Sequence, residues 1–242
     1  MPRHETVRPM TEGQKTEIQT TQLHGIPPLS FADANNILSK KGSFMDDIRA
    51  VYAKYSVEWQ TNKALMEWFS LYKGYFDIEL NFAGLNIPER RPGFNWLVVI
   101  SHEVTMQMVY DKCKQLFGAW KYTEISLDQA VPTNDRYTKN GHYAIWVRDR
   151  VEADEELKNN SADDLKASNT PGITLLERLL LELKYFKETG KHLDIDNVTL
   201  CSGSRNSDGS VPYVDWHDGR LRVGWFGPGR RDDFLRSREV VS

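Results

Sequence analysis

Three side chains that could bind a metal ion alternate along one short segment, which contains His192, Asp194 and Asp196. In an extended backbone alternate side chains point to the same side, so an imidazole and two carboxylates would meet at one position. Such groups form a ligand set for divalent cations. The segment has no family-specific spacing, and it also fits a polar connection between a helix and a strand whose charges are solvated. A metal-dependent hydrolase that uses these three residues is therefore one hypothesis.

Other candidate catalytic patterns are incomplete. His102 and Glu103 begin a zincin-like motif, but Met106 occupies the position of the second histidine, so two imidazoles cannot share one helical face. Cys201 follows a short apolar run, where a lone cysteine is more often a small core residue than a nucleophile. The chain contains no G-x-S-x-G, Walker A or dinucleotide-binding pattern. We therefore assign no catalytic residue and expect no cofactor, and the sequence does not favour an enzyme.

The C-terminal segment is rich in arginine. Guanidinium groups bind phosphate, and neighbouring aromatic rings can stack on bases, so nucleic-acid binding is a second hypothesis. The candidate residues are Arg220, Arg222, Arg230, Arg231, Arg236 and Arg238. A net charge of −3 argues against this partner, and residues 149–164 carry seven acids against two bases. The basic and acidic runs are either solvated faces, or they pair within the fold or across a subunit contact.

Residues 1–30 form a polar segment that ends in Gly25-Ile26-Pro27-Pro28, which favours extended backbone. It has few large apolar residues, so by itself it buries too little surface to offset its ordering entropy. Contact with a neighbouring subunit would bury Leu23, Ile26 and Leu29. The leading hypothesis is therefore a non-enzymatic interaction or self-assembly protein, a homo-oligomer that uses this N-terminal arm.

The spacing of apolar residues predicts an α+β fold, with helices packed on a mixed β-sheet. Residues 31–87 are expected to be helical, and residues 88–242 to form an α+β domain that ends in a β-hairpin and an arginine-rich tail. Helices are predicted over 43–55, 62–73, 105–117, 153–166 and 174–189. Strands are predicted over 94–101, 143–147, 198–201, 211–216 and 220–226, with Asp218-Gly219 as the hairpin turn.

Two finer predictions concern the helices. Ser43 is expected to cap the helix over 43–55, and Gly74 to end the helix over 62–73. The helix over 105–117 is expected to face the core with a single stripe of apolar side chains. That stripe consists of Met108, Val109, Cys113, Leu116 and Phe117.

The composition is that of a folded globular protein. Of 242 residues, 40% are hydrophobic and 27% are charged, which is too apolar for a disordered chain. Two cysteines do not indicate a disulfide framework. The sequence shows neither a signal-peptide pattern nor an apolar run of membrane-spanning length. We therefore expect a cytoplasmic protein with no membrane partner.

Two segments, Arg148–Lys158 and Leu183–Asp194, resemble those of a group of uncharacterised bacterial proteins that is common in uncultured lineages. The resemblance extends from about Arg90 to Ser242, and it includes the hairpin over 211–225 and the closing segment over 235–242. It implies a bacterial origin and carries no known activity, ligand or catalytic residue.

Overall fold

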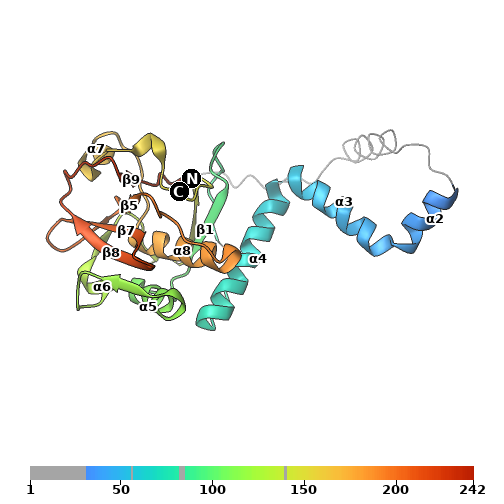
Figure 1. The fold of residues 1–242 in the computed structure, drawn as a ribbon, viewed down its shortest axis with the longest axis horizontal. Helices are drawn as coiled ribbons and strands as arrows, with labels where there is room; N and C mark the ends of the chain where they lie inside the picture. Colours follow the sequence, from blue (N-terminus) through green and yellow to red (C-terminus); the bar gives the residue numbers. More distant parts are fainter. Residues whose placement is uncertain (1–30, 56, 82–84, 139–140) are drawn as a thin grey trace. The chain divides into compact units, whose positions relative to one another are not determined.

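The computed structural model of the chain describes residues 31–55, 57–81, 85–138 and 141–242 (Figure 1). The chain divides into two compact units, residues 1–60 and 61–242. The described part of the first unit contains the helices α2 (Phe31–Ser39) and α3 (Lys41–Tyr55). Helix α4 (Val57–Phe76) crosses the division, so most of it belongs with the larger unit. The sequence had placed the boundary at residues 87/88.

Helices α3 and α4 depart from the sequence prediction at their ends. Because α3 begins at Lys41, Ser43 lies inside it and the predicted cap at Ser43 is wrong. The predicted stop at Gly74 is also wrong, since Phe76 is the last residue of α4. The next residue, Asp77, has φ 56°. Tyr75 and Phe76 in this extra turn pack against the hydrophobic core. That packing offsets the low helix propensity of a glycine inside the helix.

The larger unit contains a five-stranded mixed sheet with strand order β2-β8-β7-β5-β9. The strands are β2 (Ala119–Lys121), β5 (Val198–Leu200), β7 (Val211–His217), β8 (Arg220–Phe226) and β9 (Leu235–Ser237). The predicted hairpin is confirmed: β7 and β8 pair antiparallel, and the turn residues Asp218 and Gly219 have φ of 51° and 73°. Strands β2 and β9 run parallel to their neighbours, so the sheet is mixed, as predicted.

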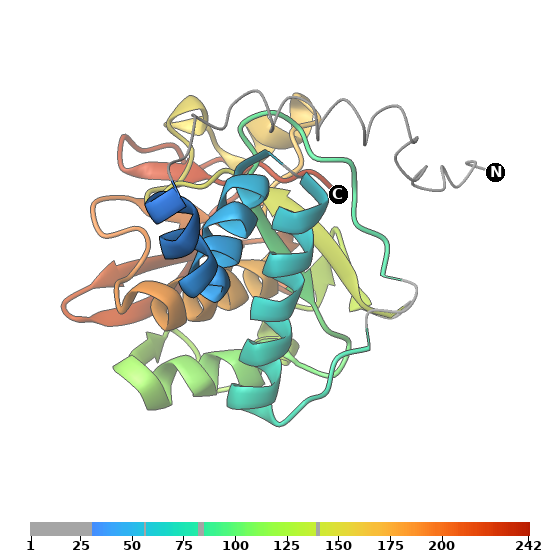
Figure 2. The same ribbon diagram turned by 90° about the vertical axis from the view of Figure 1, so that its right-hand side faces the viewer.

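A second sheet consists of two antiparallel strands, β1 (Trp96–Ile100) and β4 (Tyr143–Val147). Helix α4 lies along β1 (Figure 2). The indole of Trp68 donates to the carbonyl of Leu97 at 2.8 Å, and the hydroxyl of Tyr72 donates to the carbonyl of Val99 at 2.8 Å. The same hydroxyl accepts the backbone N–H of Ser101 at 3.1 Å. These side chains satisfy the backbone groups at an edge strand and fix the point where the chain leaves β1.

Helix α8 (Leu175–Thr189) joins the two sheets, because it contacts both β1 and β7. It begins with the predicted capping box of Thr174 and Glu177 and ends at Gly190, which has φ 67°. Three charged side chains of this helix are fully buried: Glu177, Arg178 and Glu182. Burial of charged groups requires specific partners, so α8 organises the polar interior as well as the apolar core.

The remaining described elements are short, apart from α5 (Met106–Phe117). They are α6 (Leu127–Ala130), β3 (Thr133–Asn134), η2 (Glu155–Leu157), α7 (Ala162–Ala167) and β6 (Ser204–Arg205). Thr105 and Gly118 cap the two ends of α5, but Met108 and Leu116 are exposed rather than inward. The buried stripe starts two residues earlier than predicted, at Met106. None of the helices in the described ranges is both long and apolar enough to cross a membrane.

Candidate metal site

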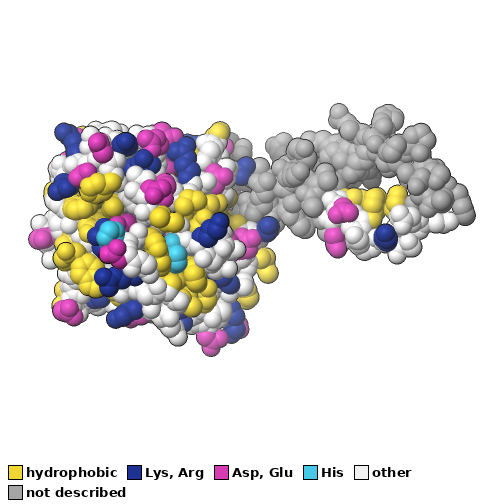
Figure 3. All heavy atoms as spheres, in the orientation of Figure 1, with side chains coloured by type: hydrophobic (Ala, Val, Ile, Leu, Met, Phe, Trp, Pro, Cys, Tyr) yellow, Lys and Arg dark blue, Asp and Glu magenta, His cyan; other side chains and the backbone are white. Residues whose placement is uncertain are grey.

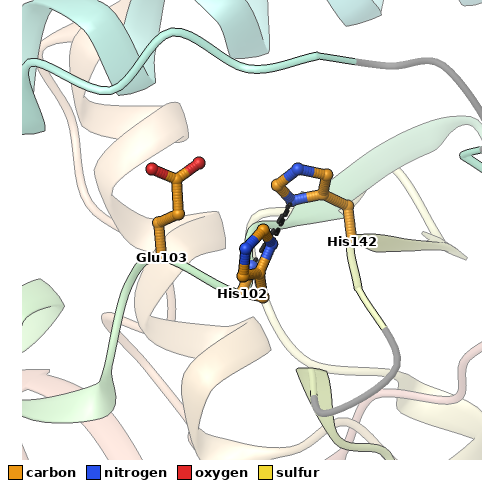
Figure 4. Close-up of side chains that lie close together, drawn as sticks. All are labelled: His102, Glu103 and His142. Carbon is orange, nitrogen blue, oxygen red and sulfur yellow. Dashed lines mark hydrogen bonds between the residues drawn. The ribbon is translucent and has the colours of Figure 1, made fainter.

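The register of β1 and β4 brings two histidines together. Ile100, the last residue of β1, pairs with Tyr143, the first residue of β4. His102 follows β1 and His142 precedes β4, so both leave the same end of the sheet. Their Nδ1 atoms lie 3.3 Å apart, and their ring centroids are 4.5 Å apart (Figure 4).

Glu103 adds a carboxylate to this pair. Its backbone N–H donates to Ser101 Oγ at 3.1 Å, which stabilises the turn that follows β1. One ligand atom from each of His102, Glu103 and His142 lies within 4.8 Å of the other two. Figure 4 shows the carboxylate and the His142 ring on opposite sides of the His102 ring. His102 and Glu103 are exposed and His142 is half-buried, so an ion can reach the cluster from solvent.

The spacing of the two imidazoles fits a tetrahedral metal ion. Zinc binds imidazole nitrogen at about 2.0–2.1 Å, so two nitrogens on one tetrahedral edge are about 3.4 Å apart. The observed 3.3 Å between the Nδ1 atoms agrees with this edge. The carboxylate lies somewhat further away, and because Glu103 is exposed, a change of rotamer can bring it into coordination.

The electrostatics favour imidazoles in the form that binds metal. Burial and the neighbouring His102 ring lower the pKa of His142, which keeps the ring neutral near pH 7. A neutral imidazole nitrogen is the atom that binds a metal. His142 Nδ1 also accepts the backbone N–H of His102 at 3.4 Å, a long contact that an ion can replace at little cost.

A cavity of about 190 Å³ adjoins the cluster, and His102 is part of its wall. The cavity is lined mainly by polar side chains from the loops around β1, β3 and β4 and from the N-terminal end of α8. They include Thr105, Asp128, Asn134, Arg136, Tyr137, Thr138, Tyr143 and Thr174. A polar cavity beside a set of metal ligands is the arrangement expected of a site that binds a small molecule.

Glu177 holds two of the lining side chains in place. Its fully buried carboxylate accepts hydrogen bonds from Arg136 Nε at 2.6 Å and from Arg136 Nη2 at 2.8 Å. It also accepts the hydroxyl of Tyr143 at 3.0 Å. Burial and the nearby Glu177 charge raise the pKa of Tyr143, so this phenol stays protonated. The cavity wall therefore has fixed donors rather than flexible side chains.

The structure does not bring His192, Asp194 and Asp196 together as a metal site. Asp194 is fully buried, and its carboxylate accepts from Arg178 Nε at 2.9 Å and from Arg238 Nη2 at 2.7 Å. His192 Nδ1 lies 2.9 Å from Glu182, while Asp196 is exposed. Within the described ranges, the set of ligand atoms close enough to share an ion is the one at His102, Glu103 and His142. The backbone is not extended at Asp194, which has φ 54°, so the alternate side chains turn to different partners.

Cys201 is a core residue, which agrees with the interpretation favoured by the sequence. Its side chain is fully buried, and burial raises the pKa of its thiol. Because the thiolate is the nucleophilic form, this environment does not favour catalysis by Cys201.

The arginine-rich segment pairs mostly within the fold. Five of its six arginines form ion pairs: Arg222 with Asp215, Arg230 with Asp232, Arg231 with Asp164, Arg236 with Glu155, and Arg238 with Asp194. Arg220 is exposed. Two of the pairs join the basic run to the acidic run over 149–164, which is one of the alternatives that the sequence left open. On the face of the 61–242 unit shown in Figure 3, basic and acidic side chains alternate. This arrangement does not favour a nucleic-acid surface there.

The predicted arm contacts, Leu23, Ile26 and Leu29, lie outside the described residues. His142, in contrast, is a site residue that the sequence analysis missed. No protein-family model, curated protein or solved structure matches this chain. The resemblance to bacterial proteins therefore stays a prediction, and the function has to be argued from the geometry of the site.

Proposed function

We propose that this protein is a metal-dependent hydrolase that binds a divalent transition-metal ion, with zinc as the best fit, through His102, Glu103 and His142. The observation that supports this most is the 3.3 Å separation of two imidazole nitrogens beside a carboxylate and a polar cavity. Two histidines and one glutamate are a ligand set found in catalytic zinc sites. Such sites keep a fourth position for water, whereas structural zinc sites have four protein ligands.

The proposed chemistry assigns a role to each part of the site. His102, Glu103 and His142 would hold the ion, and a bound zinc ion would supply a water whose pKa is lowered to about 7 and which is a nucleophile at neutral pH. The cavity beside His102 holds the substrate, and the donors fixed by Glu177 orient it. Hydrolysis then adds the water oxygen to one fragment and a hydrogen to the other. This ligand set differs from the segment 192–196 that the sequence suggested, but the class of reaction is the same.

The first experiment is to measure metal binding by the full chain. The chain is stripped with a chelator, dialysed against zinc and analysed for metal content, and then loaded with cobalt to record the absorption bands of tetrahedral coordination. We expect one ion per chain, and loss of both signals in His102→Ala. His217→Ala is the matched control, because His217 is an exposed histidine outside the cluster. Equal metal binding by all three proteins, or none by the parent chain, would rule out the site.

Self-association is a second candidate, because several large apolar side chains between residues 108 and 125 are exposed. They are Met108, Leu116, Trp120, Tyr122 and Ile125. Exposed apolar groups of this size often mark protein contacts. Light scattering of the full chain and of a chain that lacks residues 1–30 tests the candidate together with the predicted arm. We expect an oligomer that the truncation dissociates, and two monomers would contradict it.

A further inference from the structure

We infer that the cavity beside the metal site binds a small molecule that carries a carboxylate, with Arg136 as the group that recognises it. The identification of this molecule as a substrate rests on the proposed function, whereas its binding by Arg136 does not. Arg136 lines the cavity together with His102, so one ligand can reach both the guanidinium and a metal ion.

Two of the three guanidinium nitrogens of Arg136 form hydrogen bonds that hold the side chain in place. Nε and Nη2 both donate to Glu177, and Nη2 also donates to the carbonyl of Gly172 at 2.6 Å. Nη1 makes no hydrogen bond within the described part of the chain, and the side chain keeps 13% of its surface exposed. Because the guanidinium is fixed through Nε and Nη2, it needs no further ordering to donate from Nη1. It is therefore preorganised to bind an acceptor.

The rest of the lining also favours an acceptor-rich ligand. Hydroxyl groups come from Thr105, Thr138 and Thr174, among others. Asp128 is the acid in the wall, and its two oxygens are occupied by the backbone N–H groups of Met106 at 2.9 Å and Gln107 at 3.1 Å. These groups belong to the first turn of α5, whose partial positive charge offsets the carboxylate.

The charge balance favours a carboxylate over a phosphate. Glu177 already neutralises Arg136, so the cavity has directional donors but little net positive charge. A monoanion loses less hydration than a dianion on entering such a site, and one of its oxygens can accept a charge-assisted hydrogen bond from the remaining Nη1. The volume of about 190 Å³ suits a small organic acid.

The test compares N-acetylglycine with N-acetylglycinamide, which replaces the carboxylate by a neutral amide. Dissociation constants are measured by NMR titration of the full chain, both zinc-loaded and metal-free, with inorganic phosphate as a third probe. We expect the acid to bind about 10- to 100-fold more tightly than the amide, as for a hydrogen bond to a charged group. Equal affinity of acid and amide, or tighter binding of phosphate, would overturn the inference.

Two variants assign the effect to Arg136. In Arg136→Gln with Glu177→Gln, both buried charges are removed together, so neither is left unpaired. Arg136→Lys keeps the ion pair but lacks the planar fork, which covers the case in which the double variant does not fold. Arg231→Gln, an exposed arginine outside the cavity, is the matched control. We expect the preference for the acid to disappear in the first two proteins and to persist in the control; a preference that persists in all three contradicts the assignment.

The same data separate this inference from the metal proposal. If the preference for the acid requires Arg136 but the chain binds no zinc, the carboxylate site holds and the hydrolase proposal fails. If zinc binds at His102 and His142 but acid and amide bind equally, the metal site holds and the carboxylate inference fails.

Discussion

Two clusters of titratable side chains in the 61–242 unit differ in how their polar atoms are used. Around Asp194 every charged group is buried and paired: the carboxylate accepts from Arg178, Arg238, Thr199 and the backbone N–H of Ala153. At the end of β1, in contrast, His102 and Glu103 are exposed. Within the described residues, the carboxylate of Glu103 forms no ion pair or hydrogen bond. A cluster with all of its atoms paired stabilises a fold, whereas one with open ligand atoms can bind something else.

The electrostatics of Asp194 illustrate the first case. Burial opposes its charge, but Arg238 and Arg178 outweigh burial and lower its pKa. Its backbone is also unusual, with φ 54°, a conformation that aspartate and asparagine adopt more readily than most residues. Residue type and backbone are therefore both set by the interior of the protein.

The largest effect is expected for Asp194→Asn. The variant keeps the shape and the backbone preference but leaves Arg178 and Arg238 without their shared counter-charge. Removing one partner from a buried charge network costs about 3–5 kcal/mol of the free energy of unfolding. Urea unfolding of the 242-residue chain measures it, with Asp196→Asn as the control, since this exposed neighbour should change stability by less than about 0.5 kcal/mol. Equal stability of the two variants would mean that the cluster is not structural.

The second prediction separates metal binding from stability at the open cluster, which consists of His102, Glu103 and His142. His142→Ala should weaken zinc binding by about 100-fold or more, because even residues that only support a ligand contribute about 10- to 100-fold. The metal-free protein should lose little stability, since the two hydrogen bonds that this half-buried ring forms with described residues are long, at 3.3 and 3.4 Å. Competition with a zinc chelator measures the first quantity and urea unfolding the second. A large loss of stability without loss of zinc binding would place His142 in the structural class.

Local sequence patterns predicted much of the fold. The bounds of α5 and α8 and the turn of the β7–β8 hairpin depend on neighbours within a few residues. The helices predicted over 105–117 and 174–189 and the turn at Asp218-Gly219 therefore agree with the structure to within one residue. The end of α4 was wrong because Tyr75 and Phe76 pack against the core and the helix continues past Gly74. The pairing of β1 with β4 was beyond the sequence, since it joins residues that are more than forty positions apart.

For the candidate site, too, local patterns were visible in the sequence and long-range pairing was not. His102-Glu103 was considered and set aside, because the second histidine was sought four residues later on the same helix. The structure supplies it from His142 instead, through the β1–β4 register. A signal was present, since one histidine follows a predicted strand and the other precedes one, but it has meaning only if those two strands pair antiparallel. The alternation of His192, Asp194 and Asp196 was a misleading signal, because it assumed an extended backbone and Asp194 has φ 54°.

A third effect tests how the fold positions the open cluster. Tyr72→Phe removes the hydroxyl that bonds Val99 and Ser101, directly before His102. Leaving these buried backbone groups unsatisfied should cost about 1–3 kcal/mol of unfolding free energy. Zinc affinity should fall less than in His142→Ala, because the ligands remain but their turn is less rigid. Chelator competition with Tyr185→Phe as the control measures this, since that tyrosine is on α8, outside the site. An unchanged zinc affinity would mean that α4 does not position His102.

The smallest effect on stability is expected at the exposed pair of Arg231 and Asp164. This pair tests whether the number of partners or the burial of a charged group decides its contribution to stability. This pair is bidentate, at 2.7 and 2.6 Å, so its atoms are as fully partnered as those of Asp194. Both side chains are nevertheless open to solvent, where water and salt screen the attraction. Arg231→Gln should therefore leave the urea midpoint within measurement error, while Asp194→Asn shifts it strongly. The arginine is the partner to change, because Asp164 also closes the capping box of α7 with Ser161. If Arg231→Gln destabilises the protein as much as Asp194→Asn, the number of partners rather than burial would decide which clusters are structural.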